Sequence, residues 1–164
     1  PATHSSPLEA GMSSWTIEQS ATSKGAVDVT AAVDGRRQAR FRFALSGTPS
    51  SSPYVALVIP DAAGLAQHDR MTFTVRAERP LRISLQLRRQ VQGGAGDRWH
   101  RSVYADSTPR TVTVFFDEMS ARAGAPPGRP PLHEIGSVLF AVDSVNTKIG
   151  TSGQIVIDQV AYER

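Results

Sequence analysis

The stretch LRISLQLRRQVQGGAGDRWHRSVYAD, residues 81–106, has the clearest strand pattern in the chain. Apolar residues occupy the odd positions of residues 81–87. The even positions carry polar side chains: Arg82, Ser84, Gln86 and Arg88. A period of two places one set in a core and the other in solvent, as in a half-buried strand. The glycine-rich segment at residues 93–96 is then expected to turn the chain back into a second strand.

The returning strand of this predicted hairpin carries Trp99, His100, Arg101 and Tyr104. Its solvent face is expected to bring guanidinium, amide, imidazole and phenol groups together, a mixture that suits a polyhydroxylated ligand. The register stays open at this point. Either Trp99 or His100 begins the inward-facing set, because a slip of one residue exchanges the two faces of a strand.

Short strands of the same kind recur along the chain, at residues 15–19, 26–32, 39–45, 54–59, 71–77, 110–116, 137–143 and 154–162. Residues 54–59 are apolar on both faces, so this strand is either covered on both sides or met by a loop on its outer face. The helical candidate at residues 62–68 is too short to be more than a turn. Nine or ten short strands with almost no helix predict an all-β fold, a two-sheet antiparallel β-sandwich or jelly roll.

The chain of 164 residues is expected to form one domain. Residues 1–14, PATHSSPLEAGMSS, have the composition of a linker and are interpreted as a flexible tail or a first edge strand, which leaves residues 15–164 as the domain. The segment ARAGAPPGRPP, residues 121–131, is expected to run over the surface, because prolines cannot donate the hydrogen bonds of a sheet.

Composition argues against several functions. The formal net charge is +3, but the only lysines are Lys24 and Lys148 and the arginines form no run, so a nucleic-acid partner is not expected. The chain has no cysteine and therefore no disulfide or thiolate metal site. No apolar run approaches the roughly 20 residues that a membrane helix needs, so membrane insertion is not expected either.

Four segments together resemble a known family: MTFTVRAERPLRISLQLR, RWHRSVY, TVTVFFDEM and LFAVDSVNTKIGTSGQIVIDQV. Their order is similar to that in the galactose-binding-like jelly rolls of bacterial carbohydrate-binding modules. The resemblance is to the group that includes the family-eleven modules and the complex I intermediate-associated protein domains, and it spans residues 15–162.

The resemblance implies a carbohydrate ligand held on the concave face of one sheet, with no catalysis. It also implies a secreted bacterial appendage of a larger protein, in the extracellular space or the periplasm. A protein-interaction or assembly module is the alternative, indicated by the complex I branch and by the proline-rich segment at residues 121–131. A third reading is the sensory ligand-binding domain of a signalling protein.

The predicted ligand-binding residues combine planar hydrogen-bonding groups with aromatic rings. They are Arg76, Gln86, Arg88, Trp99, His100, Tyr104 and Asp143. Arg76, Gln86, Arg88 and Tyr104 are expected to project from adjacent strands onto one surface, joined by Asp143 if its strand is a neighbour. The alternative is an ordinary solvent-facing sheet surface, with arginine stems lying over apolar residues. Trp99 fits either the rim of a cleft or the core, and core positions are the commoner of the two.

A metal site is left open. Several members of the resembling group hold a structural calcium between the first strand and the last, which makes Asp158 and Glu18 the candidate pair. Calcium takes six to eight oxygen ligands, and the sequence has no acidic cluster of that kind. An exposed strand position or a turn is the alternative for Asp158.

The sequence offers no complete catalytic set, so the protein is predicted not to be an enzyme. No two predicted strands present carboxylates on the same face, as glycoside hydrolysis requires. The motifs G-x-S-x-G and H-E-x-x-H are absent, and three of the four histidines fall in predicted tails or loops, the exception being His100.

Overall fold

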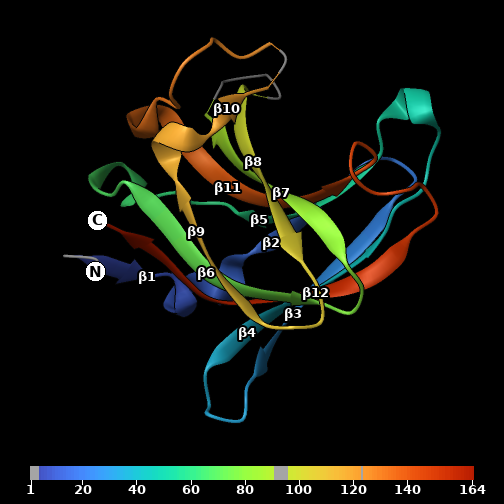
Figure 1. The fold of residues 1–164 in the computed structure, drawn as a ribbon, viewed down its shortest axis with the longest axis horizontal. Helices are drawn as coiled ribbons and strands as arrows, with labels where there is room; N and C mark the ends of the chain where they lie inside the picture. Colours follow the sequence, from blue (N-terminus) through green and yellow to red (C-terminus); the bar gives the residue numbers. More distant parts are fainter. Residues whose placement is uncertain (1–3, 91–95, 123) are drawn as a thin grey trace.

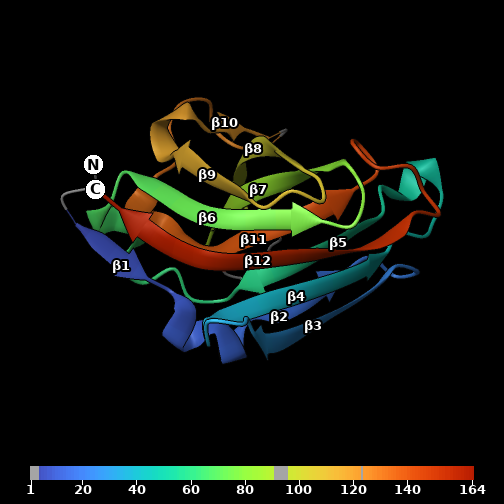
Figure 2. The ribbon, with the colours of Figure 1, turned by 60° about the horizontal axis from the view of Figure 1, so that its bottom comes forward.

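The described residues form two antiparallel sheets stacked as a β-sandwich, which confirms the predicted fold class (Figures 1 and 2). The computed structural model describes residues 4–90, 96–122 and 124–164. The predicted turn at Gly93 and Gly94 therefore lies outside the described residues.

The first sheet, sheet A, has a long C-terminal strand near its centre. Its order is β3 (Lys24–Ala31), β4 (Arg37–Ala44), β12 (Ser152–Glu163), β6 (Arg70–Ala77) and β9 (Arg110–Phe115), and β1 (Ser5–Pro7) also pairs with β12. The second sheet, sheet B, has the order β10 (Ser120–Ala121), β8 (Arg98–Ala105), β7 (Leu81–Arg89), β11 (Ile135–Asp143), β5 (Tyr54–Ile59) and β2 (Thr16–Gln19).

Short 3-10 helices interrupt the connections between strands. They are η1 (Glu9–Ser14), η2 (Pro49–Ser51), η3 (Leu65–Gln67), η4 (Phe116–Glu118) and η5 (Leu132–Glu134). None of the helices in the described part of the chain is long and apolar enough to span a membrane.

The core lies between the sheets and is built from the inward set of each alternating strand. Phe73 of β6 and Phe140 of β11 meet edge to face with ring centroids 5.2 Å apart, which joins the two sheets at the centre of the core. At one edge Gly25 of β3 lies so close to Val55 of β5 that an added Cβ atom would be 2.4 Å from the valine Cγ1. A larger residue at position 25 would push the sheets apart.

The N-terminal segment belongs to the sandwich, so the prediction of a tail up to residue 14 is wrong for residues 5–14. Met12 of η1 is buried in the core. β1 pairs with β12, which agrees with the alternative interpretation of this segment as a first edge strand. Beside β1, the backbone N–H of His4 donates to the carbonyl of Arg164 at 3.0 Å. His4 and Arg164 consequently lie side by side.

The connection from β6 to β7 moves the chain from one sheet to the other. The ladder of sheet A ends at Ala77, Pro80 has no N–H to continue it, and β7 begins at Leu81 in sheet B. Consecutive strands at this point are therefore not neighbours. The prediction that Arg76 shares a surface with Gln86 and Arg88 is wrong for this reason.

Candidate functional site

The outer face of sheet B carries the polar set of the β7–β8 hairpin. Arg88 of β7 pairs with Arg98 of β8, and Gln86 pairs with His100. Trp99 and Val103 point inward to the core, which settles the register that the sequence left open. The even-numbered side chains of β7 and β8 thus lie together on the side of sheet B away from sheet A.

The centre of this face is a floor of small apolar side chains. Ala56 and Val58 of β5 pack with Leu139 and Ala141 of β11 in a second apolar cluster, separate from the core, and the ring of Tyr54 packs against it. All four floor residues are buried although they face away from sheet A. This arrangement explains why residues 54–59 are apolar on both faces.

Three arginines stand next to one another at one end of the face. Arg88 and Arg98 are directly paired across β7 and β8. Arg122 follows β10, and its backbone N–H donates to the carbonyl of Arg98 at 2.9 Å. We call Arg88, Arg98 and Arg122 the arginine row. Like charges placed opposite each other on a sheet are destabilising unless other groups compensate them.

Glu18 of β2 compensates the first arginine of the row. Its Oε1 accepts a hydrogen bond from Arg88 Nη1 at 2.8 Å, and its Oε2 accepts one from the Tyr54 hydroxyl at 3.1 Å. Burial alone would raise the pKa of Glu18, but the hydrogen bond and charge of Arg88 outweigh it, with help from Tyr54 and Arg98, and the pKa lies below its usual value. Glu18 is therefore an anion held in a fixed position.

Two adjoining depressions hollow the outer face of sheet B. The first, which we call the Asp143 depression, has a volume of about 330 Å³. It is lined by polar groups over Ala141, among them Tyr54, Gln86, Arg98, Arg122 and Asp143. The second, the Glu18 depression, has a volume of about 670 Å³ and is lined by residues that include Glu18, Val58, Arg88, Arg89 and Ser137. Tyr54 and Arg98 line both depressions and so form the wall between them.

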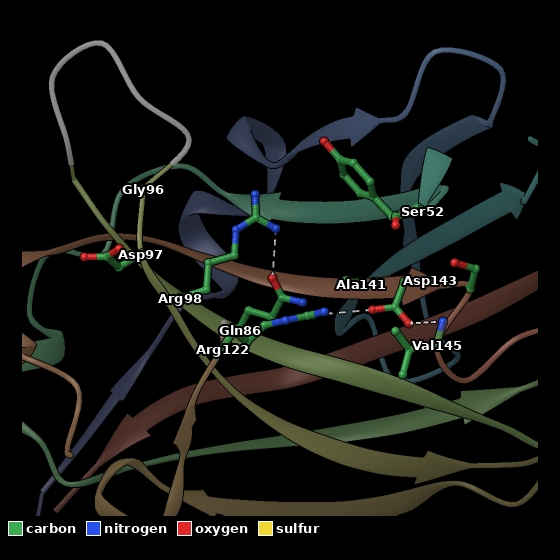
Figure 3. Close-up of a pocket in the computed structure, with 11 residues that line it drawn as sticks. Ser52, Gln86, Gly96, Asp97, Arg98, Arg122, Ala141, Asp143 and Val145 are labelled. Carbon is green, nitrogen blue, oxygen red and sulfur yellow. Dashed lines mark hydrogen bonds and ion pairs between the residues drawn. The ribbon is translucent and has the colours of Figure 1, made fainter. Parts of the chain in front are cut away.

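Hydrogen bonds orient the polar groups of the Asp143 depression (Figure 3). Gln86 is only 1% exposed, and its Oε1 accepts a hydrogen bond from Arg98 Nη1 at 3.1 Å while its Nε2 donates to Ser84 Oγ at 3.1 Å. The backbone N–H of Val145 donates to Asp143 Oδ1 at 3.1 Å, and Arg122 Nη1 lies 3.5 Å from Asp143 Oδ2. These side chains are held before any ligand arrives.

The structure brings several of the predicted site residues together. Gln86, Arg88 and Asp143 line the depressions, and His100 lies beside Gln86 on the same face. Burial lowers the pKa of His100, and the charge of Arg122 lowers it further against the opposing effect of Asp143. Neutral imidazole is the form favoured at neutral pH.

Tyr104 lies on the same face but outside the lining of both depressions. It pairs with Arg82 at the far end of the hairpin, and its side chain is 41% exposed. Its hydroxyl donates to Asp106 Oδ2 at 3.1 Å, and the guanidinium of Arg110 lies over its ring at 5.4 Å. The hydroxyl and the ring of Tyr104 thus already have partners within the protein.

Two other predicted site residues lie elsewhere. Arg76 projects from β6 on the outer face of sheet A, where it pairs with Val156 of β12. Trp99 is 1% exposed and belongs to the core, and its indole N–H donates to the carbonyl of Gly128 at 3.1 Å. The prediction of a rim position for Trp99 is wrong. Instead, this tryptophan ties the proline-rich segment to the sandwich.

The candidate calcium pair does not meet. Glu18 lies on sheet B, whereas Asp158 lies on the outer face of sheet A, 3% exposed. Asp158 Oδ2 accepts hydrogen bonds from Arg36 Nη2 at 2.9 Å and from Gln38 Nε2 at 3.0 Å, so it is neither an exposed residue nor a partner of Glu18. Among residues 4–90, 96–122 and 124–164, no group of three or more His, Cys, Asp or Glu side chains is placed to hold a metal ion.

Sequence reasoning missed three residues that shape this surface: Tyr54, Arg98 and Arg122. Arg98 follows from the hairpin register, since it is the partner of Arg88. Tyr54 begins a strand that was expected to be covered, and its alternation with Val55 signals an outward position. Arg122 lies in the segment predicted to be a surface loop, where no periodic pattern indicates the direction of a side chain.

Comparison with known proteins places the fold among carbohydrate-binding modules. No family model and no curated protein sequence matches the chain. The family 11 carbohydrate-binding module from Clostridium thermocellum, solved in complex with a β-1,3-1,4-mixed-linked tetrasaccharide, is similar with a TM-score of 0.73 and 18% identity, covering 99% of this chain and 96% of that one. The chain thus has the family 11 type of β-sandwich, as the sequence resemblance implied.

More distant structures share the sandwich. A family 30 carbohydrate-binding module is similar with a TM-score of 0.56 and 11% identity, covering 90% of this chain and 76% of that one. An exo-β-agarase is similar with a TM-score of 0.56 and 12% identity, covering 90% of this chain but only 24% of the agarase. At these identities the likeness concerns the fold, and the function has to be argued from the site.

Proposed function

We propose that this protein is a non-catalytic glycan-binding module that holds a sugar chain across the Asp143 and Glu18 depressions. The observation that carries the proposal is the ring of Tyr54, which packs on the apolar floor of sheet B and is bordered by planar hydrogen-bonding groups that are already oriented. A sugar has an apolar ring face and a polar edge of hydroxyl groups. Sites with an apolar lining and a few fixed polar groups suit such a ligand.

Tyr54 is the residue best suited to stack on a sugar ring. It stands in the wall shared by both depressions, and its ring rests on the apolar floor. Because its hydroxyl already donates to Glu18, the ring loses little further freedom when a ligand binds. Gln86 and Asp143 would then meet the hydroxyl edge of the sugar in the neighbouring depression.

The ionised state of Glu18 supports binding without catalysis. A glycosidase needs one carboxylic acid whose pKa is raised so that it can protonate the leaving group. The pKa of Glu18 is instead lowered, chiefly because the hydrogen bond and charge of Arg88 outweigh its burial. An ionised glutamate that already binds an arginine is a positioning group and a poor proton donor.

The similar structures support attachment to a larger protein, and a location outside the cytoplasm is proposed with it. The chain matches one quarter of the exo-β-agarase, so a sandwich of this size occurs there as part of a longer chain.

The protein-interaction alternative has less support. The exposed large apolar side chains of the described residues are scattered over β3, β8 and two turns and form no wide apolar face. They are Val29, Val33, Tyr104 and Val145.

The proposal is tested by calorimetric titration of the protein against a broad panel of soluble poly- and oligosaccharides. We expect saturable binding of at least one of them, weakened about fivefold or more in Tyr54→Ala because a stacking contact contributes about 1 kcal/mol or more. Arg76→Gln is the control, since Arg76 lies on the other sheet. A folded protein that binds no member of the panel would contradict the proposal.

A further inference from the structure

The arginine row points to the charge of the ligand. We infer that the Asp143 depression selects sugars with an anionic substituent, a carboxylate or a sulfate ester, held between Arg98 and Arg122. This inference rests on the proposed glycan-binding function and adds a ligand class to it. It is supported by the close spacing of the arginines, by the hydrogen bonds that occupy the nearby carboxylates, and by the arginine donors that have no close carboxylate partner.

The arginines are closer together than ordinary sheet pairing favours. Arg88 and Arg98 are a direct cross-strand pair, and Arg122 joins Arg98 through a backbone hydrogen bond. Directly opposed like charges destabilise a sheet. Burial lowers the pKa of Arg98, and the charges of Arg88 and Arg122 act in the same direction against Glu18, so the cation at this position lacks full compensation.

The nearby carboxylates are mostly engaged elsewhere. Glu18 receives Arg88 Nη1 at 2.8 Å and 3.0 Å on its two oxygens, whereas Arg98 Nη2 lies 3.7 Å from it. Asp97, which also lines the Asp143 depression, accepts a hydrogen bond from Arg89 Nη2. What remains is Asp143, whose carboxylate is shared with the backbone N–H of Val145.

Arg98 and Arg122 therefore keep donors for a ligand. The hydrogen bond of Arg98 Nη1 goes to the neutral amide of Gln86, and Arg122 Nη1 is 3.5 Å from Asp143. Charge-assisted hydrogen bonds are usually 2.7–2.9 Å long, so neither arginine has a close carboxylate partner. Figure 3 shows the Arg98 guanidinium joined to Gln86 and the Arg122 guanidinium directed toward Asp143.

An oxyanion matches these donors. Guanidinium groups bind carboxylates and comparable oxyanions through two parallel hydrogen bonds, which a neutral hydroxyl cannot accept with the same strength. A uronic acid places its carboxylate at the edge of a ring whose apolar face can stack on Tyr54. The fit is to a charged sugar rather than to a free ion, because Tyr54 offers a stacking surface for the ring.

The experiment compares sugars that differ in charge alone. Oligomers of glucuronic, galacturonic and mannuronic acid are titrated beside their carboxyl-reduced counterparts, and sulfated oligosaccharides form a second arm beside their desulfated forms. We expect at least one anionic oligomer to bind roughly tenfold to hundredfold tighter than its neutral counterpart, as charged hydrogen bonds predict. The arm with the preference identifies the anion.

Matched variants test whether Arg98 carries the preference. Arg98→Gln and Arg76→Gln each remove one positive charge, but only Arg98 lies in the depression. We expect Arg98→Gln to reduce the affinity for the anionic oligomer to that of its neutral counterpart and Arg76→Gln to leave it unchanged. Arg98→Lys keeps the charge but loses the fork, so an intermediate affinity is expected. Thermal unfolding verifies that each variant is folded.

The possible failures are distinct. Equal affinity for anionic and neutral forms of every sugar overturns the charge inference and leaves glycan binding in place. A preference that survives in Arg98→Gln, or that is lost equally in Arg76→Gln, also overturns it. Binding of neither form by the folded protein removes the inference together with the proposed function.

Discussion

On the outer face of sheet A, Arg36 and Arg42 reach Asp158 and Asp28, at 2.9 Å and 2.6 Å. On the outer face of sheet B, Arg88 and Arg98 stand opposite each other and share the single carboxylate of Glu18. Two arginines of sheet A thus form closed ion pairs, whereas Arg88 and Arg98 of sheet B form a partly uncompensated pair. The difference teaches that the position of an arginine among its partners, rather than the number of arginines, separates these two ion pairs from the arginines of the proposed binding face.

The two faces also differ in their apolar residues. Sheet B has a four-residue apolar floor, of which Ala141 and Val58 each line one depression. On the outer face of sheet A, Val156 is buried between the register positions of Arg40 and Arg76. Arginine stems can cover a single valine and leave their charged ends in water. The floor of sheet B instead supports the ring of Tyr54, which is the proposed stacking surface.

The largest expected effect is on stability, from truncation of the floor. Leu139→Ala should lower the free energy of unfolding by about 3 kcal/mol, because Leu139 is fully buried between β5 and β7 and its removal leaves a cavity. Val156→Ala on sheet A should lower the free energy of unfolding by only about 1.5 kcal/mol, because it removes fewer buried methyl groups than Leu139→Ala does. Urea denaturation measures both. A larger loss for Val156→Ala would reverse the assignment of the floor.

Asp158→Ala tests whether the carboxylate of sheet A is purely structural. We expect a loss of about 2 kcal/mol in the free energy of unfolding, because Arg36 and Gln38 lose a buried acceptor. The loss is not larger because one third of the Arg36 side chain is exposed to water, which solvates its charge. Affinity for any glycan that binds should stay within about twofold. A large change in affinity would show that the two faces are coupled.

Glu18→Gln gives a smaller effect that depends on pH. The pKa of Glu18 in the folded protein is below its ordinary value of 4.5, so the ionised form contributes stability that is fully present above pH 4.5 and is lost as the pH falls through the folded value. With one third of the side chain exposed, we expect the wild type to exceed the variant by about 1 kcal/mol near pH 7. The advantage should shrink below about pH 4.5. Thermal denaturation as a function of pH measures it, and a constant difference down to pH 2 would contradict the ion pair.

Tyr104→Ala should have the smallest effect. Tyr104 is exposed and its partners Asp106 and Arg110 keep their own ion pair, so the change in unfolding free energy should be within about 0.5 kcal/mol. Glycan affinity should change by less than about twofold, in contrast with Tyr54→Ala. If Tyr104→Ala weakened binding as strongly as Tyr54→Ala, the site would have to extend along the whole hairpin.

Much of the fold was predictable because alternation is a local property. The even set of β7 faces outward as its pattern indicates, and the strands at Tyr54–Ile59 and Ile135–Asp143 lie where apolar runs predicted them within two residues. The N-terminal segment was misread, since a polar composition conceals that Met12 is a core residue. A single buried side chain on a 3-10 helix leaves no periodic signal.

The site was predictable only in part. Gln86, Arg88 and Asp143 were named from their chemistry and do meet on one face, but Arg76 and Trp99 do not. The period of two says which residues of a strand share a side, and it cannot say which strands are neighbours. Pro80 lies in the short connection between β6 and β7. Nothing in the sequence of this connection indicates that the chain crosses into the other sheet there.

The sequence by itself determined the sandwich class and the outward row of β7, because steric alternation and the burial of apolar side chains act over a few residues. Only the tertiary structure decided the arginine row, the shared wall of Tyr54 and Arg98, and the separation of Asp158 from Glu18. These depend on sheet order and register, which are set by contacts between residues far apart in the chain. Electrostatic compensation follows from those distances, so the charge of the site could be read only once the strands were in place.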